Sequence, residues 1–352
     1  MKDIRVLIVG TGGMANAHAN AYGAMPGVSL VGGVDTNAER LGAFNDQHGI
    51  SNGFTSVADA LAWGQFDAVS NVTPDPVHYP TTMPLLAAGK HVLCEKPLAA
   101  NYAHAAEMAA AAQAAGVVNM VNLTYRNGPA LPYAAQMVAD GAIGEVRHFE
   151  ASYLQSWLTQ PAWGEWSTET QWLWRLSSAH GSLGVLGDIG VHILDFATLV
   201  AGAGASNISC RLTTFPKAPG DRIGDYVLDA NDSFNMHLRL QNGAVGVIHA
   251  SRMATGHFND LRLRIFGTKG GLDVQYEREV SLLQACIGDD ALTATWREVT
   301  LPTVQTNYER FIAAVRAGHP VLPDFARGAE LQRVLDLAVV SSAKNSLDLA
   351  LD

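Results

Sequence analysis

Short runs of apolar residues alternate with stretches of helical character over the first third of the chain. The first run, Ile4 to Val9, is almost wholly apolar and rich in β-branched residues, as in a strand buried on both faces of a parallel sheet. The later runs are Val28 to Val34, Phe66 to Val72, His91 to Cys94 and Val117 to Val121. The helices between and after them are predicted at 13–25, 38–48, 56–63, 77–88 and 101–115. This alternation predicts an α/β domain with a doubly wound parallel sheet over residues 1–124.

The pattern changes near residue 125. A helix over 130–140 is followed by extended segments at 146–155, 206–215, 231–240, 244–252, 260–266 and 272–283. Asn242-Gly243 is a typical hairpin turn between two of them. Further helices are predicted at 188–201, 305–317 and 326–345. Residues 125–352 are therefore predicted to form an α+β domain with a large, open, mainly antiparallel sheet.

Composition narrows the class of protein. A chain of 352 residues with 48% hydrophobic and 16% charged residues fits two well-packed domains. The net charge is −10 and the Lys and Arg residues are dispersed, which argues against a nucleic-acid or anionic-membrane partner. The three cysteines lie far apart without metal-ligand spacing, so reduced thiols and no metal site are expected. No apolar stretch is long enough for a signal peptide or a membrane span, and a cytoplasmic location is predicted.

The first predicted strand runs directly into a glycine-rich turn, residues 10–15, which fits G-x-G-x-x-G/A. Gly10 permits the tight turn and Gly12 lets the backbone approach a pyrophosphate, while Gly13 and Met14 begin the helix whose N-terminus faces the phosphates. The second strand ends at Asp35, about 20 residues later, where a carboxylate can bind the adenosine ribose. Together these features predict a Rossmann domain that binds NAD.

Asp35 also bears on the choice between cofactors. Its charge is expected to repel the extra phosphate of NADP. Arg40 lies one turn into the next predicted helix and is a possible partner for that phosphate. NAD is therefore predicted, with NADP as the less favoured cofactor.

Two further motifs contain groups suited to proton transfer. Glu95-Lys96-Pro97 follows a predicted parallel strand, where a lysine can reach both the nicotinamide ribose and a substrate hydroxyl; the alternative is a surface turn. Asp188 and His192 are four residues apart, so on a helix they share a face, and a carboxylate beside an imidazole raises its basicity. In the alternative interpretation Asp188 only caps the helix and His192 is a core histidine.

The order of these motifs resembles that of the Gfo/Idh/MocA oxidoreductases, a family that includes glucose–fructose oxidoreductase and inositol dehydrogenases. The similarity extends over most of the chain, including the C-terminal helix with Ser341 and Ser342. The shared motifs are the glycine-rich turn, Asn71-Val72-Thr73-Pro74 followed by His78, Glu95-Lys96-Pro97, and Asp188-x-x-x-His192. The resemblance implies that Asn71, Thr73, Pro74, His78 and Glu95 belong to the cofactor site.

The same resemblance implies that Lys96, Asp188 and His192 meet at the nicotinamide. In this family the Lys–Pro peptide is often cis, and the C-terminal sheet supports dimers or tetramers. An open sheet with an uncovered apolar face also needs protection. A homodimer or homotetramer formed through the C-terminal sheet is therefore predicted. His18 and His78 are expected to pack or to orient backbone rather than to react.

The substrate side is less defined by motifs. Trp157, Trp163, Trp166, Trp172 and Trp174 lie close together in the chain. Such residues are more often core than ligand contacts, but an indole can also stack on the apolar face of a sugar ring, with Trp163 and Trp174 as candidates. Tyr125, Arg126, Arg175 and His180 are candidate donors to substrate hydroxyls.

These features predict an NAD-dependent dehydrogenase that oxidises a secondary hydroxyl of a sugar, polyol or inositol. His192 is expected to take the hydroxyl proton, Lys96 to position the hydroxyl and stabilise the developing alkoxide, and Asp188 to hold His192. The alternatives are an NADP-preferring sugar reductase, a glycosidase that retains NAD, and a non-catalytic sugar-sensing regulator on the same fold.

Overall fold

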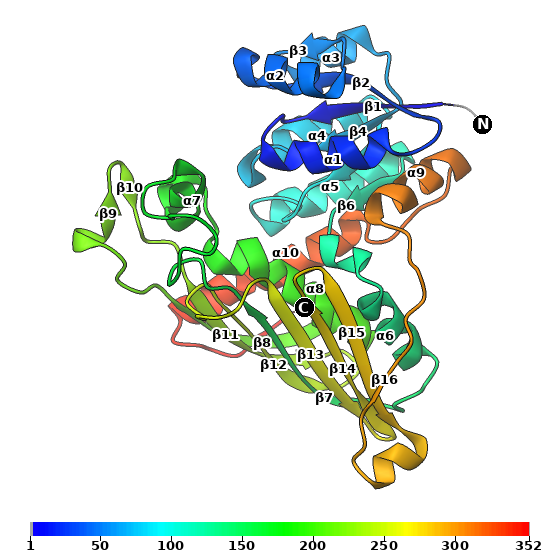
Figure 1. The fold of residues 1–352 in the computed structure, drawn as a ribbon, viewed down its shortest axis with the longest axis vertical. Helices are drawn as coiled ribbons and strands as arrows, with labels where there is room; N and C mark the ends of the chain where they lie inside the picture. The colour runs from blue at the N-terminus through cyan, green and yellow to red at the C-terminus, as the bar shows by residue number, and fades with distance from the viewer. Residues whose placement is uncertain (1–2, 352) are drawn as a thin grey trace. The chain divides into compact units, whose positions relative to one another are not determined.

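The computed structural model describes residues 3–351, which divide into two compact units (Figure 1). The first unit runs from the N-terminus to Leu123 and includes Gln305–Gln332. The second unit comprises Thr124–Val304 and the residues from Arg333 onward.

The first unit is built on a six-stranded sheet in the order β3-β2-β1-β4-β5-β6, in which all pairings among the described strands are parallel. Its strands are β1 (Ile4–Val9), β2 (Val28–Val34), β3 (Gly53–Phe54), β4 (Ala68–Asn71), β5 (His91–Cys94) and β6 (Asn119–Val121). The predicted doubly wound parallel sheet is confirmed. The short edge strand β3 was not predicted, because two residues carry no periodicity.

Helices connect these strands, and their ends follow the capping residues in the sequence. Asn37, Ser56 and Asn101 each accept a backbone N–H at a helix start, and left-handed glycines end the same helices. The helices are α1 (Gly13–Gly23), α2 (Ala38–His48), α3 (Val57–Trp63), η1 (Asp75–Val77), α4 (His78–Ala87) and α5 (Tyr102–Ala115).

The chain returns to the first unit near its C-terminal end, which differs from the predicted domain boundaries. Helix α9 (Asn307–Ala317) starts with a capping box formed by Thr306 and Glu309. Tyr308, Phe311 and Ile312 of α9 join the hydrophobic core that contains Ile4 and Val6. Burial of this apolar helix face explains why residues 305–332, which the sequence analysis placed in the second domain, belong to the first.

The second unit is built on a nine-stranded sheet in the order β16-β15-β14-β13-β7-β12-β11-β8-β17. Strands β7 and β12 pair in parallel, and the other described pairings in this sheet are antiparallel. The predicted, mainly antiparallel sheet is therefore confirmed. Its strands are β7 (Val146–Leu154), β8 (Ala205–Thr213), β11 (Ser233–Leu240), β12 (Val245–Ser251), β13 (Asp260–Gly267), β14 (Gly270–Glu277), β15 (Val280–Ile287), β16 (Arg297–Glu298) and β17 (Leu349–Ala350).

Smaller elements complete the second unit. Strands β9 (Arg222–Ile223) and β10 (Tyr226–Val227) form a separate two-stranded sheet. The longer helices are α6 (Ala130–Ala139), α8 (Val191–Ala201) and α10 (Phe325–Ala343), the last of which begins in the first unit. The short ones are η2 (Thr124–Asn127), α7 (Thr170–Leu173), η3 (Trp174–Leu176), η4 (Ser178–His180), η5 (Leu186–Gly190), η6 (Pro219–Asp221) and η7 (Gly288–Leu292).

The two faces of the large sheet differ in chemistry. On β13, Leu261, Leu263 and Ile265 are buried on the face that helices α6 and α8 cover (Figure 1). The alternate residues Arg262 and Arg264 lie on the opposite face, where Asp273 and Glu150 pair with them. An ionic ladder thus occupies this part of the open face, and the expectation of an uncovered apolar surface does not hold there.

Strand β17 pairs with only part of β8, and the C-terminal helix covers the next part of that strand. The Ser341 and Ser342 hydroxyls of α10 accept the backbone N–H groups of Cys210 and Leu212 on β8, at 2.9 and 3.0 Å. Both serines therefore satisfy donors of a strand that would otherwise remain open to pairing.

Candidate active site

At Gly10 the glycine-rich turn between β1 and α1 has room for backbone only. Gly10 has φ +87°, and a Cβ there would lie 2.7 Å from the carbonyl oxygen of Val72 and 2.8 Å from the backbone nitrogen of Thr73. By contrast, a Cβ on Gly12 or Gly13 would meet nothing within 4 Å, so the start of α1 is open. An unobstructed helix N-terminus is suited to a pyrophosphate, and these residues fit NAD.

Asp35 lies directly after β2 and is almost fully hydrogen-bonded within the first unit. Its Oδ2 accepts the backbone N–H and hydroxyl of Thr11, both at 2.9 Å, and its Oδ1 accepts the backbone N–H of Asn37 at 2.9 Å. The Arg40 guanidinium binds both oxygens, at 2.9 and 2.6 Å. Although burial raises the pKa of Asp35, these donors hold that pKa well below its usual range. Arg40, half exposed, thus occupies the acceptor positions that a ribose diol would use.

The turn after β4 is held by Asn71, which is fully buried. Its side-chain nitrogen donates to the hydroxyls of Thr81 and Thr82 at 2.8 and 2.9 Å, and its oxygen accepts the backbone N–H and hydroxyl of Thr73 at 3.2 and 2.8 Å. Asn71 therefore fixes the position of Thr73 and Pro74 at the end of the strand.

His78 connects this turn to the one that follows β5. Its Nε2 lies 2.7 Å from the carbonyl oxygen of Thr73 and its Nδ1 lies 2.8 Å from that of Pro97. Carbonyl oxygens only accept, so both ring nitrogens must carry hydrogen, and the ring is an imidazolium. Burial lowers the pKa of His78, but the Cys94 sulfur, the Asp75 carboxylate and the Pro97 carbonyl raise it to about 10.

Glu95 in the Glu95-Lys96-Pro97 motif is buried and bonded inside the first unit. Its Oε1 lies 2.9 Å from Nε2 of His18 and accepts Nδ2 of Asn122 at 2.6 Å, while its Oε2 accepts the backbone N–H of Lys96 at 3.2 Å. Burial raises the pKa of Glu95, but His18, Lys96 and Asn122 outweigh that effect and lower it to about 2. The carboxylate thus fixes the backbone of Lys96. The Lys96–Pro97 peptide is cis, as the family resemblance implied.

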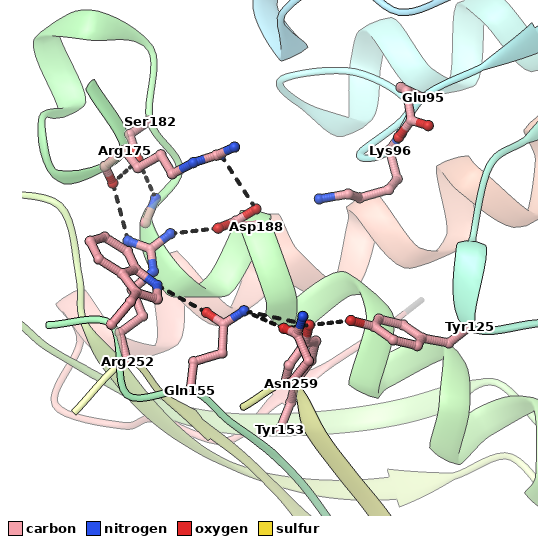
Figure 2. Close-up of polar contacts among 12 residues, drawn as sticks. Glu95, Lys96, Tyr125, Tyr153, Gln155, Arg175, Ser182, Asp188, Arg252 and Asn259 are labelled. Atoms are coloured by element: carbon pink, nitrogen blue, oxygen red, sulfur yellow. Dashed lines mark hydrogen bonds and ion pairs between the residues drawn. The ribbon is translucent and has the colours of Figure 1, made fainter. Parts of the chain in front are cut away.

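In the second unit, Asp188 lies in η5, a π-helical turn directly before α8; such turns are frequent at functional sites. The Asp188 carboxylate accepts Nη2 of Arg252 at 2.9 Å, and Nη1 of Arg175 lies 3.8 Å from it (Figure 2). The Arg252 side chain is fully buried, lies over the Trp157 ring and donates to the carbonyl oxygen of Arg175. Burial lowers the pKa of Arg252, and Asp188 opposes that shift.

His192 lies in the first turn of α8 and is buried. The ring of Tyr125 meets it edge-on, with centroids 4.8 Å apart, and Tyr153 is its next aromatic neighbour at 6.5 Å. Burial raises the pKa of both tyrosines, and the negative charge of Asp188 adds to the shift. Asp188, His192, Tyr125 and Tyr153 thus form one cluster within the second unit.

Hydrogen bonds connect Tyr125 through Tyr153 and Asn259 to Gln155 (Figure 2). Tyr125 bonds to Tyr153 through their hydroxyls, and Tyr153 donates to Oδ1 of Asn259 at 2.6 Å. Nε2 of Gln155 donates to the same Asn259 oxygen at 2.7 Å, and the Trp157 indole donates to Oε1 of Gln155 at 3.1 Å.

Other predicted substrate residues are engaged elsewhere. Arg126 forms a bidentate ion pair with Asp195, at 2.8 and 2.6 Å, and both side chains are buried. This geometry favours a structural role for Arg126 over donation to a substrate. His180 is exposed, with its ring against Tyr226 and its Nδ1 3.0 Å from the Ser177 hydroxyl.

Most of the tryptophans belong to a satellite core. Trp157 is its buried centre, and Trp163, Trp166 and Trp172 pack against this cluster. The ring of Trp163 also stacks on Phe258 at 3.7 Å. Trp174 instead lies under the Arg175 guanidinium. These contacts support the core interpretation for Trp163 and leave Trp174 as the better candidate for a substrate contact.

Two family models match the chain. Residues 4–123 match an oxidoreductase family with an NAD-binding Rossmann fold, and residues 132–273 match the GFO/IDH/MocA C-terminal domain. The chain belongs to the GFO/IDH/MocA oxidoreductase family. This confirms the resemblance inferred from the motifs, and the first unit is an NAD-binding domain.

Individual relatives of this family are sugar oxidoreductases. Levoglucosan dehydrogenase of Pseudarthrobacter phenanthrenivorans is 28% identical over 98% of each chain. The 1,5-anhydro-D-fructose reductase of Ensifer adhaerens is 30% identical over 82% of this chain and 80% of its own. A solved structure of levoglucosan dehydrogenase in complex with NADH and levoglucosan superposes with a TM-score of 0.87, at 27% identity over 99% of each chain.

Two kinds of feature are absent from residues 3–351. No helix in this range combines the length and the apolar character that crossing a membrane requires. Within the same range no three or more His, Cys, Asp and Glu side chains are grouped as a metal ion would need.

Several residues around Asp188 and His192 were not among those predicted from the sequence. Arg252 follows β12 directly, so the rule that polar residues at strand ends gather at one edge could have identified it. Tyr153 is the penultimate residue of β7, and Gln155 directly follows that strand. Asn259 lies in a loop with φ +51°, a conformation that asparagine tolerates, and no sequence pattern links it to Tyr153.

Proposed function

We propose that this protein is an NAD-dependent dehydrogenase that oxidises a secondary hydroxyl of a sugar, polyol or inositol. The observation that carries the proposal is the similarity to levoglucosan dehydrogenase over nearly the whole of both chains. When bound, NAD supplies the acceptor for the hydride. The residues of this chain bind and orient the substrate and move its hydroxyl proton.

His192 is the proposed general base. A neutral imidazole accepts a proton efficiently near neutral pH, whereas a lysine in water is protonated there. The edge-on contact with Tyr125 restricts rotation of the His192 ring, which supports a fixed direction of proton transfer.

Lys96 is the proposed cation that positions the substrate hydroxyl and stabilises negative charge as the proton leaves. Its support is structural: Glu95 binds its backbone N–H, and His78 binds the carbonyl of the next residue, Pro97. With both sides of the residue held, the lysine side chain starts from a fixed backbone. Glu95 and His78 then serve as positioning residues, which agrees with the expectation that His78 orients backbone.

Asp188 is proposed to orient His192 and to bind a neighbouring substrate hydroxyl. Its ion pair with buried Arg252 keeps the carboxylate charged and fixes one of its oxygens. Arg175, half buried at 3.8 Å from the carboxylate, is the candidate donor to the substrate on this side. Arg126 is not retained in this role, because Asp195 occupies its guanidinium.

An NADP-preferring reductase remains the second candidate, because Arg40 lies at the position that would meet a ribose phosphate. The test is a screen of sugars, polyols and inositols with NAD and NADP side by side, following NADH or NADPH absorbance. The proposal expects turnover of at least one cyclic polyol or anhydrosugar with NAD. A preference for NADP would overturn the cofactor assignment. Cofactor that stays bound without net NADH formation would favour an NAD-retaining glycosidase.

The roles of the catalytic residues are tested by substitution. His192→Ala is expected to lower turnover by about 10²- to 10⁴-fold while NAD binding stays nearly intact. Lys96→Ala should impair turnover and substrate binding together, because its charge acts on both. His249→Ala, a half-buried histidine on β12, serves as the matched control. Normal turnover in His192→Ala would show that the histidine is structural.

The protein is also proposed to be a homodimer or homotetramer formed through the large sheet. The ion pairs on the open face of the sheet, such as Arg262–Asp273 and Arg264–Glu150, form a polar surface against which a second copy could pack. Light scattering at micromolar concentration checks this, and a monomer would contradict it.

A further inference from the structure

In the hydrogen-bond chain beside His192 the donor and the acceptor at each link can be assigned, and the assignment starts from Trp157 at its buried end. Trp157 is 2% exposed, and its indole N–H can only donate. Its partner atom on Gln155 must therefore be the carbonyl oxygen Oε1, which lies at 3.1 Å. This contact fixes the orientation of the Gln155 amide, whose nitrogen then faces Asn259.

The next two links follow by the same count of donors and acceptors. Nε2 of Gln155 donates to Asn259, so the Asn259 atom at 2.7 Å is its oxygen. An amide oxygen cannot donate, so the Tyr153 hydroxyl donates its one hydrogen to the same Asn259 oxygen, at 2.6 Å. The Tyr153 oxygen is then an acceptor toward Tyr125, and the Tyr125 hydrogen points at Tyr153.

We propose that Tyr125 presents a hydrogen-bond acceptor, and not a donor, to the substrate. The bonds from Trp157 and from Tyr125 converge on the Asn259 oxygen, so the hydrogen of the Tyr125 hydroxyl is used within the protein. This inference rests on the proposed function for the nature of the ligand, a polyhydroxylated ring. Tyr125 is the tyrosine of the pair that keeps exposed surface, and its ring contacts His192. Tyr125 therefore selects substrates that carry a hydroxyl group, able to donate a hydrogen, at the ring position facing the Tyr125 oxygen.

The chain also excludes a proton wire. The members beyond Tyr153 are the amides of Asn259 and Gln155, which hold their hydrogens on nitrogen and do not shuttle them. Burial raises the pKa of Tyr125 and of Tyr153, so both hydroxyls keep their hydrogen at neutral pH. The role of the chain is thus orientation, and Gln155, Asn259 and Tyr153 are positioning residues.

Neutron diffraction of the deuterated wild-type protein tests the direction without reference to activity. The proposal expects a deuteron on the Tyr125 oxygen pointing at Tyr153, and one on the Tyr153 oxygen pointing at Asn259. A deuteron on Tyr153 that points at Tyr125 would overturn it. This result is independent of the proposed function, which the substrate screen decides separately.

Two variants with the same added charge test the functional consequence. In Gln155→Glu the side chain can only accept, so Asn259 must turn its nitrogen toward it, and the order of donors reverses up to Tyr125. In Asn259→Asp the carboxylate still accepts from Gln155 and Tyr153, so the order is kept. The second variant is therefore the control for charge and for loss of stability.

Dissociation constants for levoglucosan and for analogues with each ring hydroxyl replaced in turn by fluorine provide the readout. Fluorine carries no hydrogen to donate. In the wild type one analogue should bind roughly three- to tenfold more weakly than levoglucosan, as expected for one neutral hydrogen bond. Asn259→Asp should keep this ratio, while Gln155→Glu and Tyr125→Phe should abolish it. An unchanged ratio in Gln155→Glu and Tyr125→Phe would refute the assigned role.

Discussion

The turns of the first unit and the surroundings of Asp188 in the second unit are both rich in buried polar contacts. The contacts differ in how far apart the bonded residues lie in the sequence. His78 binds carbonyl groups that are 5 and 19 positions away in the chain. In the second unit, Asp188 and Arg252 are 64 positions apart, and Tyr153 and Asn259 are 106 apart. The turns that His78 connects are thus held from within the motifs, although Glu95 also binds His18, 77 positions away. Arg252 and Asn259, by contrast, belong to no motif.

This difference changes the meaning of a motif. Asn71, His78 and Glu95 look like ligand contacts in the sequence, yet their side chains bind the backbone and side chains of the protein itself. In this unit these motif residues stabilise the turns after the strands. Around Asp188, by contrast, the motif supplies the proposed catalytic groups, and the partners of Asp188 lie outside the motif.

The largest effect is expected from a test of the first region. In the folded protein the pKa of His78 is raised to about 10 from 6.5, so the folded state binds more protons than the unfolded state between these values. Its stabilisation is complete below pH 6.5 and is lost as the pH rises through 10. His78→Gln should therefore lower the free energy of unfolding by about 4 kcal/mol at pH 6 and by only about 1 kcal/mol at pH 9. Urea unfolding at pH 6 and pH 9 measures it.

The control for this experiment is His148→Gln, because His148 is an exposed histidine on β7. It should keep the wild-type dependence on pH. If the free energy of unfolding changes equally between pH 6 and pH 9 in the wild type and in His78→Gln, His78 is neutral. Its proposed role in joining the two turns as an imidazolium would then be wrong.

The second test breaks the long-range contact in the other region. Arg252→Met leaves the Asp188 carboxylate without its buried partner, and removal of one partner from a buried pair costs about 3–5 kcal/mol. Asp188 keeps 25% of its side chain exposed, so water offsets part of this loss and about 3 kcal/mol is expected.

The double variant Asp188→Asn/Arg252→Met decides the cause, because it removes both charges. It should be more stable than Arg252→Met alone. If the single and double variants unfold at the same urea concentration, the loss comes from packing against Trp157 rather than from the ion pair.

The fold was largely predictable from the sequence, for reasons visible in particular elements. The strands of the first unit are apolar runs, and helices between them start at asparagine caps and end at glycines. These strands and helices could therefore be placed from local residues alone. The return of α9 to the first unit could not be predicted, because the apolar face of Tyr308, Phe311 and Ile312 does not specify which core it joins.

The candidate site was predictable only in part. Gly10, Asp35, Lys96, Asp188 and His192 were recognisable because each has a fixed position relative to a strand end or a helix start. The partners that set their charge and orientation were not, because register in the large sheet brings β7, β12 and the Asn259 loop together over long separations. Arg126 is a further example: the sequence offers it as a candidate donor to the substrate, and it does not reveal the ion pair with Asp195, 69 positions away, which favours a structural role.

The smallest expected effect concerns Asp35, the predicted ribose-binding carboxylate, which pairs with the nearby Arg40. Arg40 binds both oxygens of Asp35, so a ribose diol must compete with it. Asp35→Ser should weaken NAD binding by about tenfold, or about 1.4 kcal/mol, and reduce the difference in affinity between NAD and NADP.

Arg40→Met should act in the opposite sense, strengthening NAD binding slightly and weakening NADP binding, because it frees the carboxylate and removes a phosphate partner. Arg5→Met, which removes an arginine paired with Asp67 in the same sheet, is the control. Fluorescence titration with both cofactors measures all three variants. If Arg40→Met weakens NAD binding, the arginine serves the ribose together with Asp35, and the carboxylate is positioned by Arg40 rather than blocked by it.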